Sequence, residues 1–239
     1  QQELQDSSSS SSSSIQDQPM KIKGRGNSTW QYPKTPSKIK SDSKIPMFGE
    51  APDKEWVLLA NYLDKSLLRN DIAFYMGGIS NLEYTSCSHF VQLYLNGEYC
   101  GVYQLSEQLK IAKSRVNVGD DGFLLEIDAK AESEDITFNV PHIEMPINIK
   151  EPYVEVGDAS YNYITEYLRQ VDEVLFSENF TDSANGYTRY LDVETFVDWY
   201  LINEITKNAD AIFYTSCYMH LARNGKLKMG PLWDFDLAF

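Results

Sequence analysis

The C-terminal segment Trp233-Asp234-Phe235-Asp236-Leu237-Ala238-Phe239 contains two aspartates separated by one residue. If the segment is extended, alternate side chains share a face, so both carboxylates point the same way, within roughly 7 Å of each other. At a separation of about 4 Å they would repel each other by on the order of 4 kcal/mol. Mg²⁺ removes this cost, and it prefers one or two carboxylates together with phosphate oxygens. The pattern therefore indicates either a metal–phosphate site or an acidic strand end that faces water.

Basic residues gather near the other end of the chain. Five of them lie between Lys21 and Lys38 with no acidic residue among them. The same stretch contains Gly24 and Gly26, which permit backbone conformations that other residues resist. Glycine-rich backbone amides together with arginine and lysine can cradle phosphates. The alternative is a solvated edge strand, because lysines protect exposed sheet edges.

The composition limits the classes of partner. The chain has 239 residues, of which 42% are hydrophobic, and a formal net charge of −14. That length is sufficient for a sizeable core, and so acidic a chain argues against nucleic acid or an anionic membrane surface as partner. No apolar run reaches the length of a membrane span, and no signal peptide is visible. The three cysteines, Cys87, Cys100 and Cys217, match no metal-ligand spacing and leave the disulfide state open.

The elements that must position these residues follow from local patterns. Two strands, 90–95 and 99–105, flank Asn96-Gly97 and predict a tight hairpin. Further strands are expected at 122–128, 136–138 and 147–150. Helices are expected over 64–75, 160–176 and 192–207. In the last of these we expect a buried face of Val193, Phe196, Val197, Tyr200, Leu201 and Ile205. A second hairpin should turn at Asn224-Gly225.

The order of these elements suggests an α+β protein with two lobes, a β-rich half followed by an α-rich half. Residues 1–19 contain eight consecutive serines and read as a flexible tail or linker. A β-rich part is expected over 20–152, ending near Glu151-Pro152. An α-rich part follows over 153–239. A nucleotide between them would meet cations on one side and carboxylates on the other, as phosphoryl transfer requires.

Four blocks, in this order and spacing, resemble the CotH kinase family over about residues 21–239. The blocks are Arg25-Gly26-Asn27-Ser28-Thr29-Trp30 with Pro33-Lys34, Leu59 to Asn70, Gly101-Val102-Tyr103 through Glu107, and Pro231 to Asp236. The family comprises secreted or surface-associated proteins named for a bacterial spore-coat kinase. The resemblance implies a divergent protein-kinase-like, two-lobed fold. It also implies an atypical kinase that uses ATP and Mg²⁺, with Mn²⁺ or Ca²⁺ as alternatives, to phosphorylate serine, or also threonine, on protein substrates. An extracellular or cell-surface location is implied as well.

The resemblance also implies roles for the acidic residues. Asp210 resembles the catalytic aspartate that orients or deprotonates the acceptor hydroxyl; it could instead simply end its helix. Asp234 or Asp236 resembles the metal-binding aspartate, and which of them is the main ligand stays open.

The basic residues receive roles in the same way. Arg25, Lys34 and Lys38 are candidates for phosphate contacts, with Lys34 first among them. Lys150 is a further candidate near the junction of the two parts. Glu107 could orient one of the lysines, as an ion pair does in ordinary kinases, or could be a surface residue.

Two features depart from the family pattern. Thr215-Ser216-Cys217 stands where many relatives have an asparagine suited to a second metal. The sequence also stops at Phe239, where relatives continue, so the α-rich part is expected to be truncated. The alternatives are a non-catalytic, surface-exposed binding or structural module of pseudokinase type, and metal-dependent phosphoester hydrolysis.

Overall fold

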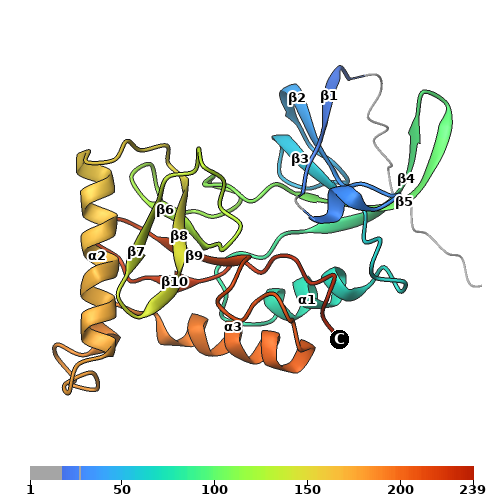
Figure 1. Ribbon diagram of the computed structural model, residues 1–239. Coiled ribbons are helices and arrows are strands. Elements are labelled where there is room, and N and C mark those ends of the chain that lie inside the picture. The colour runs from blue at the N-terminus through green and yellow to red at the C-terminus, as the bar shows by residue number, and fades with distance from the viewer. Residues whose placement is uncertain (1–17, 27) are drawn as a thin grey trace, which may run out of the picture.

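The computed structural model describes residues 18–26 and 28–239 (Figure 1). Its described part contains two antiparallel five-stranded sheets and three α-helices, which confirms the expected α+β class. There are also two 3₁₀ helices, η1 (Ser28–Gln31) and η2 (Tyr187–Arg189). The serine-rich tail expected over 1–19 lies almost entirely outside the described residues. Within them, no helix has both the length and the apolar character that crossing a bilayer requires.

The first sheet is built from the N-terminal strands. Its strands are, in spatial order, β1 (Met20–Gly24), β2 (Ser37–Ile45), β3 (Asp53–Leu59), β5 (Glu98–Glu107) and β4 (Ser88–Leu95). The β4–β5 hairpin turns at Asn96 (φ 51°) and Gly97 (φ 86°), which confirms the predicted hairpin. Positive φ at both positions is what a type I′ turn needs. Trp56, Leu58 and Leu105 are almost fully buried in the core of this sheet.

The second sheet joins strands from both ends of the chain. Its strands are, in spatial order, β10 (Lys228–Met229), β9 (Cys217–Leu221), β6 (Phe123–Ile127), β8 (Ile143–Glu151) and β7 (Thr137–Val140). β9 and β10 are the expected second hairpin, with Asn224 at φ 61° beside Gly225. Because β6 pairs with β9, this sheet continues across the boundary that the sequence suggested near residue 152. β6 is buried along its whole length.

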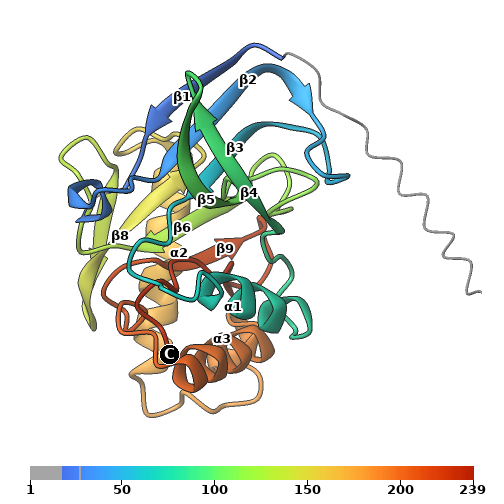
Figure 2. The same cartoon turned by 90° about the vertical axis from the view of Figure 1, so that its right-hand side faces the viewer.

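Three helices flank the sheets. They are α1 (Arg69–Gly78), α2 (Ala159–Leu175) and α3 (Val193–Thr206). Figure 1 shows α2 standing against the second sheet, whereas α1 and α3 lie side by side next to the C-terminus, as Figure 2 confirms from a second direction. α2 lies within one residue of the expected 160–176 at each end, and its cap is Asp158, whose carboxylate accepts a hydrogen bond from the Tyr161 amide at 2.6 Å.

α1 begins at Arg69, later than the expected start at Asp64. The carboxylate of Asp64 accepts hydrogen bonds from the amides of Ser66 and Arg69, both at 2.9 Å. Leu67 has a positive φ of 63°, which interrupts any helix before Arg69. Asp64 therefore organises a turn that precedes the helix.

The buried face of α3 differs from the expected one. Val197, Tyr200, Leu201 and Ile205 are 46–64% exposed. The residues that α3 buries are Thr195, Trp199, Ile202, Asn203 and Thr206. Apolar residues are spread around the helix and not gathered on one side, so periodicity could not select a face. Contacts with α1 and β10 select it instead, including a hydrogen bond from the Met229 amide to the Thr195 hydroxyl at 3.1 Å.

Candidate functional site

A cleft of about 290 Å³ lies between the two sheets. Its walls come from the β1–β2 loop, the segment after β3, the start of α1, strands β6, β8 and β9, and the C-terminal segment. The lining includes Arg25, Gly26, Lys34, Asn61, Asn70, Glu126, Asp128, Lys130, Lys150, Ser216, Tyr218, Trp233, Asp234 and Asp236. The structure thus brings together Lys34 and the aspartate pair, which lie at opposite ends of the sequence.

The β1–β2 loop carries the first two cations. Its ends are joined by a hydrogen bond from the Arg25 amide to the Pro36 carbonyl at 3.2 Å. Gly26 has a φ of 96°, and a Cβ there would lie 2.1 Å from Oγ1 of Thr29, so only glycine fits. The Arg25 guanidinium lies 5.4 Å from the centre of the Trp233 ring. Trp233 is 6% exposed and stacks on Phe74, so it serves the core as well as the cleft wall.

Lys34 is held in the cleft by neutral groups. Its ammonium donates to the carbonyl of Ala60 at 2.6 Å and to the carbonyl of Val102. It also lies 4.5 Å from the centre of the Tyr103 ring. Burial lowers the pKa of Lys34. Because these partners carry no negative charge, they orient the ammonium without neutralising it, and its charge is left for an anion in the cleft.

A second pair of basic residues enters from the other sheet. Lys150 on β8 forms an ion pair with Glu126 on β6 at 3.2 Å, and both line the cleft. Burial raises the pKa of Glu126, which Lys150 partly offsets. Lys130 follows β6, and its amide donates to the Asp128 carboxylate at 2.9 Å. Three lysines and Arg25 therefore face one cavity.

The segment that carries Asp234 and Asp236 is held by polar contacts from α1. Arg69 donates from its guanidinium to the Asp236 carbonyl at 2.7 Å. The side-chain oxygen of Asn70 accepts from the Phe235 amide at 2.9 Å. Phe235 itself is 1% exposed and points into the core. The two aspartates on either side of it therefore remain at the cleft.

This segment is not the extended strand that the sequence suggested. Asp234 has a φ of 63°, and Asp236 lies in a turn. Aspartate tolerates this left-handed conformation better than most residues. The Ser216 hydroxyl, also at a positive φ (57°), donates to the Asp234 carboxylate at 3.3 Å. Both carboxylates line the cleft, as expected, but through backbone turns and not through strand alternation.

The surroundings of the two carboxylates disfavour their charged forms. Burial raises the pKa of Asp236 to about 7, and the negative charges of Asp234 and Asp210 add to the shift. Burial also raises the pKa of Asp234; the charge of Asp210 adds to this shift and Arg25 offsets part of it. Both groups therefore resist ionisation where they lie, and a bound cation would remove the cost.

The donor set decides which cation fits. Asp234 and Asp236 offer carboxylate oxygens, with Asp128 and Glu126 in the same cleft. Oxygen-only sites favour Mg²⁺, Mn²⁺ and Ca²⁺ over softer metals. The residues present therefore fit a hard divalent ion.

Asp210 lies beside this centre, just after α3. Its amide donates to the side-chain oxygen of Asn208 at 3.4 Å, and the side-chain amide of Asn208 donates to the Asp234 carbonyl at 3.3 Å. Asn208 thus links the Asp210 turn to the aspartate segment. The charge of Asp210 contributes to the raised pKa of both Asp234 and Asp236.

Lys38 and Glu107, two of the expected site residues, lie in another cluster. Lys38 forms an ion pair with Glu55 at 3.0 Å, outside the residues that line the cleft. Glu107 accepts from the Tyr84 hydroxyl at 2.7 Å and lies 3.5 Å from the Arg115 guanidinium. Among the described residues, the expected pairing of Glu107 with Lys34 or Lys38 is not formed. The sequence alone could not show that Arg115, and not Lys34 or Lys38, would lie next to Glu107.

The residues that sequence reasoning missed include Asn61, Arg69, Asn70, Glu126 and Asp128. The first three belong to the block 59–70, whose polar residues were visible only as part of a family pattern. Asn70 donates to Asn61 at 3.2 Å, and Asn61 donates to Gln104 at 2.9 Å, so the block is bound into one network. Glu126 lies within the strand expected over 122–128, and nothing in the neighbouring sequence marked it as a site residue.

The raised pKa of Asp236 predicts how stability changes with pH in metal-free protein. The folded carboxyl holds its proton up to about pH 7, whereas the unfolded one releases it near 3.8. Between these values the folded state binds more protons, so the free energy of unfolding falls as pH rises. We expect Asp236→Asn to raise the melting temperature relative to the wild type, and this increase should be larger by about 5 °C or more at about pH 8 than at about pH 5.

This difference is measured by thermal denaturation in the presence of a chelator. Asp42→Asn, at an exposed position on β2, is the matched control. An equal effect of Asp236→Asn at both pH values would show that the carboxyl is ionised throughout.

Comparison with known proteins agrees with the geometry. No curated protein matches the chain. The family described as CotH kinase protein matches residues 22–239, which is nearly the whole chain and includes every cleft residue named above. The chain therefore belongs to the CotH kinase family.

Proposed function

We propose that the protein is an atypical protein kinase that transfers the γ-phosphate of ATP to serine, and also threonine, of a protein substrate with the help of a divalent metal ion. The observation that carries this proposal is one cleft that contains both several basic residues, among them Lys34 with its neutral partners, and a buried aspartate pair. Phosphoryl transfer depends mainly on positioning and on charge neutralisation, and this cleft offers both kinds of group.

Each residue then has a distinct task. Arg25, Lys34 and Lys150 bind the phosphate oxygens. Asp234 and Asp236 hold the metal ion, which neutralises charge on the phosphates when it is bound. Asp210 accepts the proton of the serine hydroxyl while the hydroxyl oxygen bonds to the γ-phosphorus and ADP leaves. The substrate is a protein with accessible serines, and the family's connection with the spore coat suggests a surface or extracellular location.

The alternative is a binding module of pseudokinase type that keeps the fold without turnover. One observation favours it. In the segment where many relatives have an asparagine suited to a second metal, the side chains here form hydrogen bonds within the protein. The Thr215 hydroxyl donates to Asp128 at 3.0 Å, and the Ser216 hydroxyl donates to Asp234. Such a protein would bind nucleotide and leave it intact.

The proposal is tested by nucleotide binding and by transfer. At saturating ATP with Mg²⁺, we expect the melting temperature to rise by about 5 °C or more. Lys34→Met should weaken ATP binding about 10- to 100-fold, because a charge-assisted hydrogen bond to phosphate is lost. The dissociation constants are measured by calorimetry, and transfer by the incorporation of labelled γ-phosphate into an acceptor protein.

Lys44→Met is the control, because Lys44 is an exposed lysine on β2 outside the cleft. Equal ATP affinity of the two variants would contradict the role of Lys34. Absence of ATP binding to the wild type would contradict the kinase proposal as a whole. Binding without transfer to any acceptor would favour the pseudokinase alternative.

A further inference from the structure

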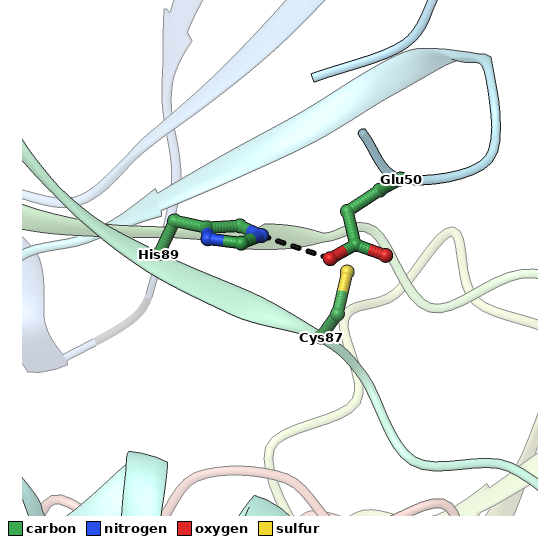
Figure 3. Close-up of side chains that lie close together, drawn as sticks. All are labelled: Glu50, Cys87 and His89. Atoms are coloured by element: carbon green, nitrogen blue, oxygen red, sulfur yellow. Dashed lines mark hydrogen bonds and ion pairs between the residues drawn. The ribbon is translucent and has the colours of Figure 1, made fainter. Parts of the chain in front are cut away.

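A second group of metal-ligating side chains lies on the first sheet, away from the cleft. Glu50, Cys87 and His89 each offer one ligand atom, and these atoms all lie within 4.8 Å of one another. Figure 3 shows the carboxylate of Glu50, the thiol of Cys87 and the imidazole of His89 directed at one point. None of the three residues lines the cleft.

The backbone explains why the three side chains converge. Cys87 immediately precedes β4 and His89 is its second residue, so the two stand two positions apart and share one face of the strand. Glu50 comes from the turn before β3. That turn contains two residues with positive φ, Phe48 at 52° and Gly49 at 85°, and it is closed by the Glu50 amide donating to the Met47 carbonyl at 3.0 Å.

Neighbouring groups orient the ligands. Nε2 of His89 lies 2.9 Å from Oε1 of Glu50, and the Phe48 ring stacks on the imidazole with the ring centres 4.9 Å apart. The carbonyl of Cys87 accepts from the Ser106 hydroxyl at 2.9 Å, and its amide donates to Glu107 at 3.3 Å. All three ligand residues are partly buried and remain reachable by an ion from solvent.

The electrostatics favour a cation. The Glu50 carboxylate belongs to the cluster, and the Glu107 carboxylate accepts from the Cys87 amide at 3.3 Å, so two carboxylates lie beside the thiol. A metal ion bound here would take the thiolate and one carboxylate as ligands, and the thiol proton would be released to solvent.

We propose that Glu50, Cys87 and His89 form a zinc-class metal site with three protein ligands and a fourth position left to solvent. A thiolate, an imidazole and a carboxylate are ligands that Zn²⁺ accepts, and tetrahedral bonds of about 2.0–2.3 Å put the ligand atoms roughly 3.3–3.8 Å apart. The observed spacing requires only small side-chain movements. Mg²⁺ is not expected here, because it prefers an all-oxygen site.

The consequence of the site is structural. β4 is an edge strand of the first sheet, and Glu50 belongs to the turn that leads into β3. An ion bound by all three residues ties this turn to the edge strand. It therefore stabilises the sheet whose β1–β2 loop contains Lys34 and whose strand β5 supplies the Val102 carbonyl.

The site is tested with the whole chain, prepared without a histidine tag and free of metal. Titration with Co²⁺ as a spectroscopic substitute is expected to produce a thiolate-to-metal charge-transfer band at one equivalent, and Zn²⁺ should displace the Co²⁺. Cys87→Ser should abolish the band. Cys100→Ser should retain it, since Cys100 lies on β5 outside the cluster. Asp236→Asn should also retain it, which separates this site from the cleft.

Thermal denaturation gives a second readout. Zn²⁺, but not Mg²⁺, should raise the melting temperature through this site, and Glu50→Gln or His89→Gln should weaken Zn²⁺ binding at least about tenfold. A charge-transfer band that survives in Cys87→Ser would overturn the proposal, as would wild-type Zn²⁺ binding weaker than about 10 μM. ATP affinity of the Cys87→Ser, Glu50→Gln and His89→Gln variants is expected to remain unchanged, so the outcome is independent of the kinase proposal.

Discussion

Asp234→Asn is expected to lower the rate of phosphate transfer about 100- to 1,000-fold, the range found when a group that stabilises transition-state charge is removed. The loss arises because an amide is a far poorer ligand for a hard cation than a carboxylate. Asparagine is the appropriate substitution because it tolerates the left-handed backbone that Asp234 adopts, at φ 63°. Its side-chain oxygen can also still accept from the Ser216 hydroxyl.

The decisive measurement is the dependence of ATP affinity on metal concentration. In the wild type, Mg²⁺ or Mn²⁺ should tighten ATP binding, and in Asp234→Asn this effect should largely disappear. Melting curves in chelator separate loss of metal from loss of folding, because removing a buried charge should leave the fold at least as stable. Metal-dependent binding equal to that of the wild type would rule out Asp234 as a ligand.

The complementary expectation concerns Asp210→Asn. We expect turnover to fall about 100- to 10,000-fold, the range for loss of a general base, while ATP affinity changes by no more than about threefold. The structure supports a large effect on turnover with a small effect on ATP affinity. Asp210 stands beside the aspartate pair and influences it through its charge. In the variant, the pKa of Asp236 should fall, since one source of repulsion is gone.

Single-turnover kinetics with a serine-containing acceptor protein measure the transfer step, and calorimetry measures ATP binding. An Asp71→Asn variant in the first turn of α1 provides the control for a carboxylate outside the cleft. A loss of ATP binding as large as the loss of turnover would assign Asp210 to the metal centre instead. Full activity of the variant would show that Asp210 has no role in transfer and simply stands at the end of its helix.

The two variants together also separate kinase from pseudokinase. A kinase loses transfer in both and loses metal-dependent binding only in Asp234→Asn. A pseudokinase shows the same loss of binding in Asp234→Asn but has no transfer to lose in the wild type.

Features with local causes were predictable from the sequence. The β4–β5 hairpin follows from Asn96-Gly97, because both residues accept the positive φ of a tight turn. α2 follows from a regular apolar period together with an acidic residue before its first turn. The family follows from the order and spacing of short blocks, and the match over residues 22–239 confirms it.

Features decided by competition between distant groups were not predictable in this way. In α3 the apolar residues are spread around the helix, so only packing against α1 and β10 decided which face is buried. Glu107 had several basic residues available, and the fold brought Arg115 to it. Lys38 was equally suited to phosphate and to carboxylate, and the neighbouring strand supplied Glu55.

The sequence by itself determined the residue types that phosphoryl transfer needs and the local turns that carry them, because backbone preferences act over a few neighbouring residues. The tertiary structure alone decided which of those residues meet. It placed Lys34 and Asp236 in one cleft, added Lys150 paired with Glu126, and brought Glu50 to Cys87 and His89. Charge interactions depend on distance and burial, and both are set by the packing of segments far apart in the chain.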